Sequence, residues 1–128
     1  MQQEKESSRI LLGSGGIGTE KRISLYRKLT SEHFAECSEV LFIPYASSDH
    51  HGYTLRMQKL NLNGHSLIGI ESFENPIEAV EKSQGIYIGG GNSFLLIRRL
   101  HEMGLIGPIR DRVSESIPYM GVSAGSNV

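Results

Sequence analysis

The sequence of 128 residues has very little cysteine. Cys37 is the only one, so an intrachain disulfide is excluded. An unpaired thiol is more typical of a reducing compartment than of a secreted protein. We therefore expect a cytoplasmic protein that is stabilised by a packed core and not by crosslinks.

The sequence also lacks an excess of positive charge and any long apolar run. The formal net charge is -1 and the basic residues are scattered, which argues against a nucleic-acid partner. No apolar stretch approaches the roughly 20 residues of a membrane helix, so we expect no membrane association. The first eight residues are polar and include acids, unlike a signal peptide. We expect residues 1–8 to be a disordered tail and residues 9–128 to form one α/β domain.

Short apolar blocks alternate with amphipathic stretches along the whole chain, and no segment is repeated. The pattern predicts strands at residues 9–12, 40–43, 66–70, 85–88 and 117–120. It predicts helices at about 20–36, 55–62 and 76–82, and one that starts near 94 and ends near 104. Strands that are separated by helices cannot pair as hairpins, so crossovers should build a mainly parallel sheet. We therefore predict a three-layer αβα sandwich with a doubly wound sheet, in which the continuously apolar strand 40–43 is central.

In a doubly wound sheet, ligands bind outside the carboxyl ends of the strands. The glycine-rich and polar loops at 13–18, 46–52 and 89–92 should all lie at this edge, together with Ser123. Residues 121–125 read Gly-Val-Ser-Ala-Gly, which fits the G-x-S-x-G nucleophile elbow, and a predicted strand leads directly into them. The motif predicts Ser123 as a nucleophile, and the alternative is a tight turn without catalytic function.

The triple-glycine loop at 89–92 follows a predicted strand and opens a helix, so its backbone N–H groups could stabilise a developing negative charge. We expect an oxyanion hole formed by the N–H groups of Ala124 and Gly91, with Gly90 as the alternative to Gly91. Asn92 and Gly121 are candidates for the substrate pocket. The alternative interpretation is an ordinary flexible loop between a strand and a helix.

Other motifs permit other functions. Residues 13–18 satisfy G-x-G-x-x-G, but the second predicted strand ends without the acid that a dinucleotide ribose requires, which favours a wall of the active-site edge. His50 and His51 could supply a base for Ser123, although adjacent histidines in a polar loop are more typical of a solvated surface. We find no third ligand for a metal site, and expect none.

The order of these motifs resembles peptidase E, the α-aspartyl dipeptidase family of serine peptidases. The resemblance lies in Leu-Phe-Ile-Pro-Tyr-Ala at 41–46, Gly-Gly-Gly-Asn-Ser-Phe at 89–94, the segment 104–109, and Tyr-Met-Gly-Val-Ser-Ala-Gly-Ser-Asn at 119–127. It implies a flavodoxin-like or class I glutamine amidotransferase-like fold. Some relatives of that fold carry a cysteine nucleophile, but here the position is Ser123.

The resemblance further implies hydrolysis of dipeptides with an N-terminal aspartate through an acyl-enzyme on Ser123, without a cofactor or metal. In that family the catalytic histidine and its acidic partner follow the serine, in a C-terminal portion that we expect to be missing after the elbow. We therefore expect the 128 residues alone to be inactive, and to form a homo-oligomer or to pair with that portion. The alternative is a catalytically dead module that binds a small ligand or a dinucleotide.

Overall fold

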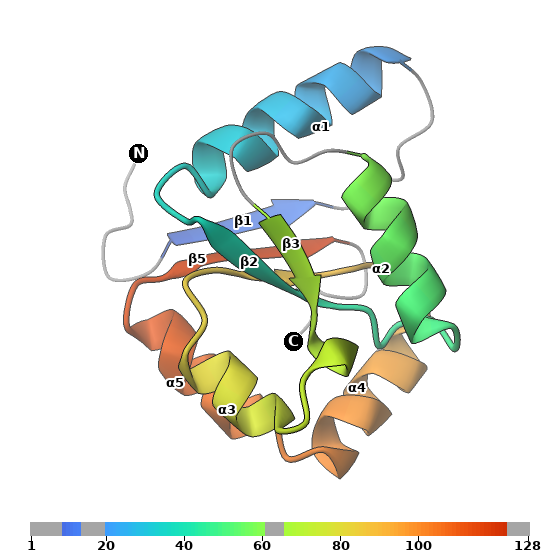
Figure 1. The fold of residues 1–128 in the computed structure, drawn as a ribbon, viewed down its shortest axis with the longest axis vertical. Helices are drawn as coiled ribbons and strands as arrows, with labels where there is room; N and C mark the ends of the chain where they lie inside the picture. The colour runs from blue at the N-terminus through green and yellow to red at the C-terminus, as the bar shows by residue number, and fades with distance from the viewer. Residues whose placement is uncertain (1–8, 14–19, 61–65, 123–128) are drawn as a thin grey trace.

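The computed structural model describes residues 9–13, 20–60 and 66–122. Its centre is a sheet of five parallel strands (Figure 1). Across the sheet the order is β1-β5-β4-β2-β3. The strands are β1 (Arg9–Gly13), β2 (Glu39–Ile43), β3 (Ser66–Gly69), β4 (Ile86–Ile88) and β5 (Pro118–Val122).

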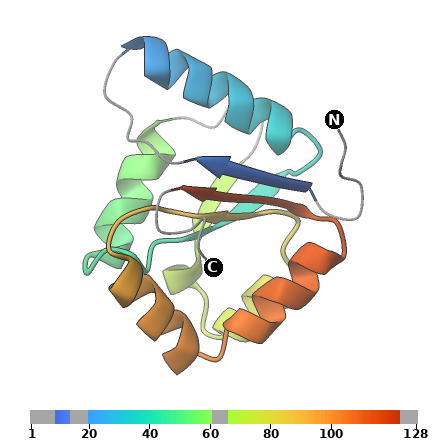
Figure 2. The same ribbon diagram turned by 180° about the vertical axis from the view of Figure 1, so that it is seen from behind.

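Helices cover both faces of this sheet, as the views from the two sides show (Figures 1 and 2). One face carries α1 (Glu20–His33) and α2 (His50–Lys59). The other face carries α3 (Pro76–Glu81), α4 (Ser93–Glu102) and α5 (Ile106–Ser114), with the short 3-10 helix η1 (Ile70–Ser72) between β3 and α3. The structure confirms the predicted αβα sandwich.

Alternate side chains of the internal strands pack into two separate hydrophobic cores, one on each face of the sheet. In β2, Val40 and Phe42 face α1 and α2, whereas Leu41 and Ile43 face α3, α4 and α5. All four side chains are buried. The continuous apolar run of β2 therefore has the physical cause that the sequence suggests: a strand covered on both faces has no polar side.

The connections change direction between β2 and β4, which are neighbours in the sheet. From β2 the chain passes through α2 on one face to β3, and from β4 it passes through α4 and α5 on the other face to β5. The helices that follow the two strands thus lie on opposite sides of the sheet. Such a topological switch point opens a crevice at the carboxyl ends of the strands, where ligands bind in this class of fold.

Three details of the fold differ from the prediction. The middle strand is β4, and β2 is internal but second from the edge. Helix α2 begins at His50 and not near residue 55, because the Asp49 side chain caps it and accepts the N–H of Gly52 at 3.1 Å.

Helix α5 was not predicted at all. Gly107 and Pro108 in its first turn obscured the spacing of the buried residues Leu105 and Ile109. Proline is tolerated in a first turn because the N–H that it lacks would have no partner within the helix there.

Candidate functional site

The triple-glycine loop lies at the carboxyl edge of the sheet beside the end of β5. Strands β4 and β5 are parallel neighbours, and Ile88, the last residue of β4, is opposite Gly121. Gly89 is the next residue after Ile88, and Val122, the last residue of β5, is the next residue after Gly121. The loop after β4 therefore begins beside the end of β5.

Backbone hydrogen bonds hold this loop against the end of β2. The N–H of Gly89 donates to the carbonyl of Ile43 at 3.1 Å, and the N–H of Asn92 donates to the carbonyl of Ala46 at 2.9 Å. Gly91, between them, has a φ of +144°. A Cβ at Gly91 would lie 2.8 Å from the Ala46 carbonyl oxygen, so both conformation and space require glycine at this position.

Asn92 ends the loop and caps helix α4. Its side-chain oxygen accepts the N–H groups of Phe94 at 2.9 Å and Leu95 at 3.1 Å. The helix thus begins directly after the glycines, and its partial positive charge is close to Gly91. Because its side-chain oxygen is occupied by the cap, Asn92 would meet a substrate through its amide nitrogen.

The structure brings some of the predicted site residues together and leaves others outside the described residues. Gly90, Gly91 and Asn92 form the loop, and Gly121 is buried in β5 next to it. Ser123 and Ala124 lie outside the described residues, as does most of the glycine cluster at 13–18. The nucleophile and one oxyanion donor therefore remain predictions from the motif.

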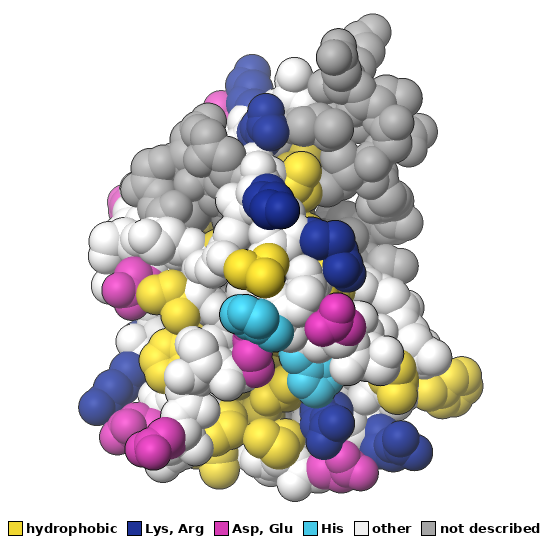
Figure 3. All heavy atoms as spheres, turned by 45° about the vertical axis from the view of Figure 1, so that its right-hand side comes forward, with side chains coloured by type: hydrophobic (Ala, Val, Ile, Leu, Met, Phe, Trp, Pro, Cys, Tyr) yellow, Lys and Arg dark blue, Asp and Glu magenta, His cyan; other side chains and the backbone are white. Residues whose placement is uncertain are grey.

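The histidines at the start of α2 lie in a charged cluster. Figure 3 shows histidine side chains among acidic and basic ones on the face that α2 and α4 form. His51 is exposed, with its Nδ1 3.5 Å from a carboxylate oxygen of Glu71. His50 packs against the ring of Tyr45, and burial, assisted by the charge of Arg99, lowers the pKa of His50. A histidine that is neutral at physiological pH can accept a proton, but no described contact links it to the glycine loop.

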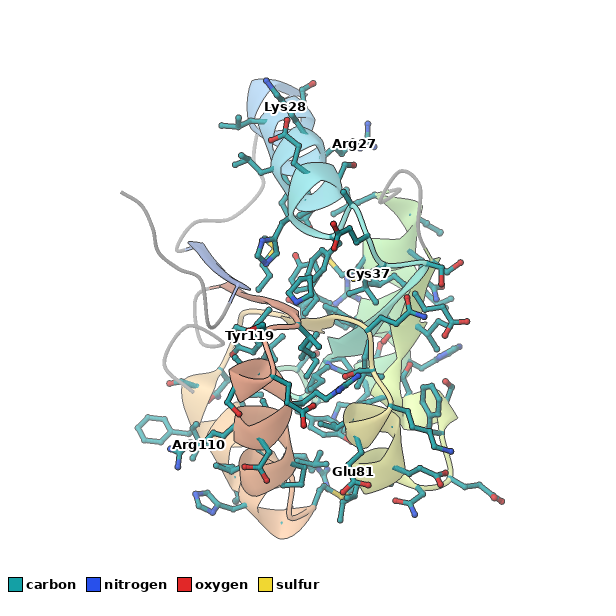
Figure 4. The ribbon with its side chains drawn as sticks, turned by 90° about the vertical axis from the view of Figure 1, so that its left-hand side faces the viewer. Arg27, Lys28, Cys37, Glu81, Arg110 and Tyr119 are labelled. Carbon is teal, nitrogen blue, oxygen red and sulfur yellow. The ribbon has the colours of Figure 1, made fainter. Side chains whose placement is uncertain are left out.

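Cys37 and Tyr119 are structural residues. Figure 4 shows Cys37 in the interior below α1, where its thiol donates to the carbonyl of Gln84 at 3.3 Å. Burial raises the pKa of Tyr119 to about 12, so its hydroxyl stays protonated. The carbonyl of Tyr119 lies 2.8 Å from Nε2 of His33, which ties α1 to β5. Cys37 is thus a small buried side chain of the core on this face of the sheet.

One residue at the edge carries no sequence signal. The hydroxyl of Tyr53, on α2, donates to the carbonyl of Gly90 at 2.9 Å. A single tyrosine in an amphipathic helix is ordinary core composition, so only the tertiary structure shows this contact.

Within the described parts of the chain, no group of three or more His, Cys, Asp and Glu side chains is arranged to hold a metal ion. No helix among the described residues has the length and apolar character to cross a bilayer.

The fold and this edge define a doubly wound α/β protein with a glycine loop at the switch point, where this class of fold binds its ligands. A crystal structure of a peptidase from an acI-B1 Actinobacterium has the same fold, with a TM-score of 0.61 at 20% identity, covering 89% of this chain and 54% of that one. The model of Peptidase family S51 matches residues 9–128. The chain belongs to that family.

Curated relatives agree with this membership and with the resemblance to peptidase E. A Drosophila melanogaster protein named "Probable alpha-aspartyl dipeptidase" is 42% identical over 96 residues, which are 73% of this chain and 40% of the relative. Peptidase E of Nostoc sp. is 34% identical over 127 residues, which are 95% of this chain and 52% of the relative. The chain spans about half the length of the curated relatives it matches.

Proposed function

We propose that the protein containing this chain is a serine-type dipeptidase that hydrolyses dipeptides with an N-terminal aspartate. Membership of Peptidase family S51 and the name of the Drosophila relative support the reaction and its substrate class. The observation that carries the proposal is the position of the glycine loop. The loop that contains its conformationally special residue, Gly91, begins beside the end of the strand that leads into the predicted elbow at Ser123.

In the proposed reaction the Ser123 oxygen attacks the scissile carbonyl carbon and its proton passes to a general base. The carbonyl electrons move to oxygen, and the N–H groups of Gly91 and Ala124 stabilise that oxyanion. Collapse of the tetrahedral species breaks the peptide bond, and the departing amine takes the proton. Water then attacks the acyl-enzyme and releases aspartate, and the proton of the water returns to the serine oxygen.

The base and its acidic partner are proposed to come from a region of the relatives that this chain does not cover. This chain covers 40% and 52% of the two relatives above, and the resemblance to peptidase E implies that both groups follow the serine. Pairing with such a region, or self-association, is also proposed as the way the apolar surface of α4 is covered. Phe94 on that helix is 87% exposed. A cytoplasmic location is proposed because a single cysteine cannot form an intrachain disulfide, and such cysteine usage is typical of a reducing compartment.

A fluorophosphonate probe tests the proposed nucleophile. We expect it to label the full gene product that contains this chain at Ser123, and to leave the Ser123→Ala variant unlabelled, because the reaction forms a bond to the activated serine oxygen. The 128 residues by themselves should react at least about 10⁴-fold more slowly, since removing the base removes most of the activation. Mass spectrometry of the labelled peptide identifies the site. If a wild-type protein that folds is labelled at no serine, the serine mechanism is wrong.

A further inference from the structure

The hydroxyl of Tyr53 connects helix α2 to the glycine loop across the switch point. The bond to the Gly90 carbonyl is 2.9 Å long and joins residues 37 positions apart. Helix α2 follows β2 and the loop follows β4, so the contact spans the two strands between which the connections change direction. The tyrosine therefore reaches the part of the edge where this fold class binds its ligands.

The surroundings of Tyr53 hold its ring in one place. The ring packs edge-to-face against Phe42, with centroids 5.1 Å apart and planes at 84°. The guanidinium of Arg56 lies 5.4 Å from the centre of the same ring. A Cβ on Gly89 would lie 2.6 Å from the Tyr53 hydroxyl oxygen and 2.8 Å from Phe42, so the absence of a side chain at Gly89 leaves room for the tyrosine. The aromatic ring and the first glycine fit each other.

Tyr53 is a hydrogen-bond donor under ordinary conditions. Burial raises the pKa of its hydroxyl above the usual value, so the group keeps its proton at neutral pH. The Gly90 carbonyl can only accept. The direction of the bond is therefore settled by chemistry: O–H of Tyr53 to C=O of Gly90.

Holding the Gly90 carbonyl also sets the direction of the Gly91 N–H. The described peptide bonds are all trans, and in a trans peptide the C=O and the following N–H point in opposite directions. The carbonyl of Gly90 turns toward α2, so the N–H of Gly91 turns away from it. The N–H groups of Gly89 and Asn92 are already bonded to the end of β2, but no acceptor among the described residues takes that of Gly91.

We infer that Tyr53 is a positioning residue for acyl transfer: its hydroxyl fixes the Gly90–Gly91 peptide so that the Gly91 N–H stays oriented to receive negative charge. The inference rests on the proposed function for its chemical meaning. The control of the Gly90–Gly91 peptide orientation by the Tyr53 hydroxyl does not depend on the proposed function. Glycine on both sides of this peptide makes rotation easy, which is why a fixing contact matters here.

The Tyr53→Phe variant tests this inference because it removes the hydroxyl and keeps the ring. Tyr26→Phe is the matched control: it removes a hydroxyl from the same aromatic cluster, but one that is hydrogen-bonded to the hydroxyl of Tyr87 and not to the Gly90 carbonyl. Both variants and the wild type are compared as full gene products. Loss of an oxyanion donor costs about 10²- to 10³-fold in kcat, and a misoriented donor should cost roughly 10- to 100-fold. We expect that loss in kcat and in probe labelling for Tyr53→Phe, with little change in KM, and no such loss for Tyr26→Phe.

The second readout is independent of catalysis. The ¹⁵N–¹H resonance of Gly91 and the hydrogen exchange of its amide should change in Tyr53→Phe and remain as in the wild type in Tyr26→Phe. If the Gly91 amide is unchanged in Tyr53→Phe, or if that variant reacts as fast as Tyr26→Phe, the inference is overturned. If the wild type itself is never labelled, the proposed function fails, and the Gly91 resonance alone decides whether Tyr53 sets the peptide orientation.

Discussion

Gly91 shows how a single residue can be restricted by its surroundings from two directions. Its φ of +144° lies in a region that side chains disfavour, and the carbonyl oxygen of Ala46 occupies the place of a Cβ. Backbone strain of this type costs about 1–3 kcal/mol. The restriction acts on the same peptide whose N–H is proposed to bind the oxyanion, so stability and activity should respond together at this position.

Gly91→Ala is therefore expected to lower the free energy of unfolding by about 1–3 kcal/mol and to slow probe labelling. Gly107→Ala is the control, because a Cβ at Gly107 meets nothing within 4 Å and the residue lies in helix α5. Alanine is favoured over glycine in a helix by up to about 0.5–1 kcal/mol, so Gly107→Ala should be as stable as the wild type or more stable. Urea denaturation measures both variants. Equal midpoints for the two would contradict the steric argument.

At the residue scale the sequence predicted that the glycine loop is part of the candidate site, but not the contacts that hold the loop in place. The run 89–91 after a strand predicted donors for negative charge, since glycine permits close backbone approach. That Gly89 makes room for Tyr53, and that Gly91 fits against Ala46, depends on residues more than 35 positions away. Such contacts leave no local periodicity or spacing from which they could be predicted.

Among the elements, α4 depends on one capping residue next to the site. Asn92 accepts two N–H groups of the first turn of α4. Loss of such a cap costs about 1 kcal/mol, within a range of about 0.5–2. The helix contributes the fully buried Leu96 and Leu100 to the core, so a loosened first turn also loosens the glycine loop that precedes it.

We expect Asn92→Ala to lower the free energy of unfolding by about 1 kcal/mol, whereas Asn92→Asp should keep the cap and most of the stability, because a carboxylate accepts the same N–H groups. Probe labelling should fall in both variants: the alanine loosens the loop, and the aspartate places a negative charge near the proposed oxyanion. Thermal denaturation and labelling rates separate these effects. An Asn92→Asp protein as unstable as Asn92→Ala would show that the side-chain oxygen does not act as a cap.

The elements themselves were predicted to different degrees. Strands β2, β3 and β4 and helix α3 lie within a residue or so of the expected ranges, because apolar runs and Pro76 mark them locally. Helix α5 was missed and α2 was placed too late. In both helices the first turn is the cause. Gly107 and Pro108 hide the start of α5, and the start of α2 depends on the cap that Asp49 provides.

On the scale of the whole molecule, the pH dependence of stability should report the environment of His50. Burial first, and then the positive charge of Arg99, lower the pKa of His50, while Glu71 and Asp49 act in the opposite direction. The unfolded chain, with a histidine pKa near 6.5, therefore takes up a proton before the folded protein does. Above that pH His50 is neutral in both states and does not make stability depend on pH. As the pH falls from about 6.5 toward the lower pKa of the folded state, protonation favours the unfolded chain and the free energy of unfolding decreases.

Urea denaturation between about pH 7.5 and pH 5.5 should show this loss in the wild type, and a weaker pH dependence in His50→Gln. The same substitution at His101, whose side chain is exposed on α4, is the control. The slopes of the free energy of unfolding against pH are compared, and not the absolute stabilities. A loss of packing against Tyr45 changes the absolute stability but not this slope. A slope in His50→Gln identical to the wild-type slope would remove His50 as the cause.

The sequence by itself determined the class of architecture and predicted the place of the candidate site. Alternating apolar blocks separated by amphipathic stretches permit only crossover connections, and glycines at strand ends identify the edge where a ligand binds. The peptidase E motifs determined the family, because several short patterns in a fixed order are far more specific than any one of them. All of these are local properties, readable within a few residues.

Only the tertiary structure decided the strand order, with β4 in the middle, and the contact of Tyr53 with Gly90. Strand order depends on how the helices pack over the sheet, and an apolar strand such as β2 shows that it is covered but not which neighbours it has. The orientation of the Gly91 N–H follows from that packing, since α2 must lie over the end of β2 before its tyrosine can reach the loop after β4. Long-range packing therefore determined how the predicted loop is held.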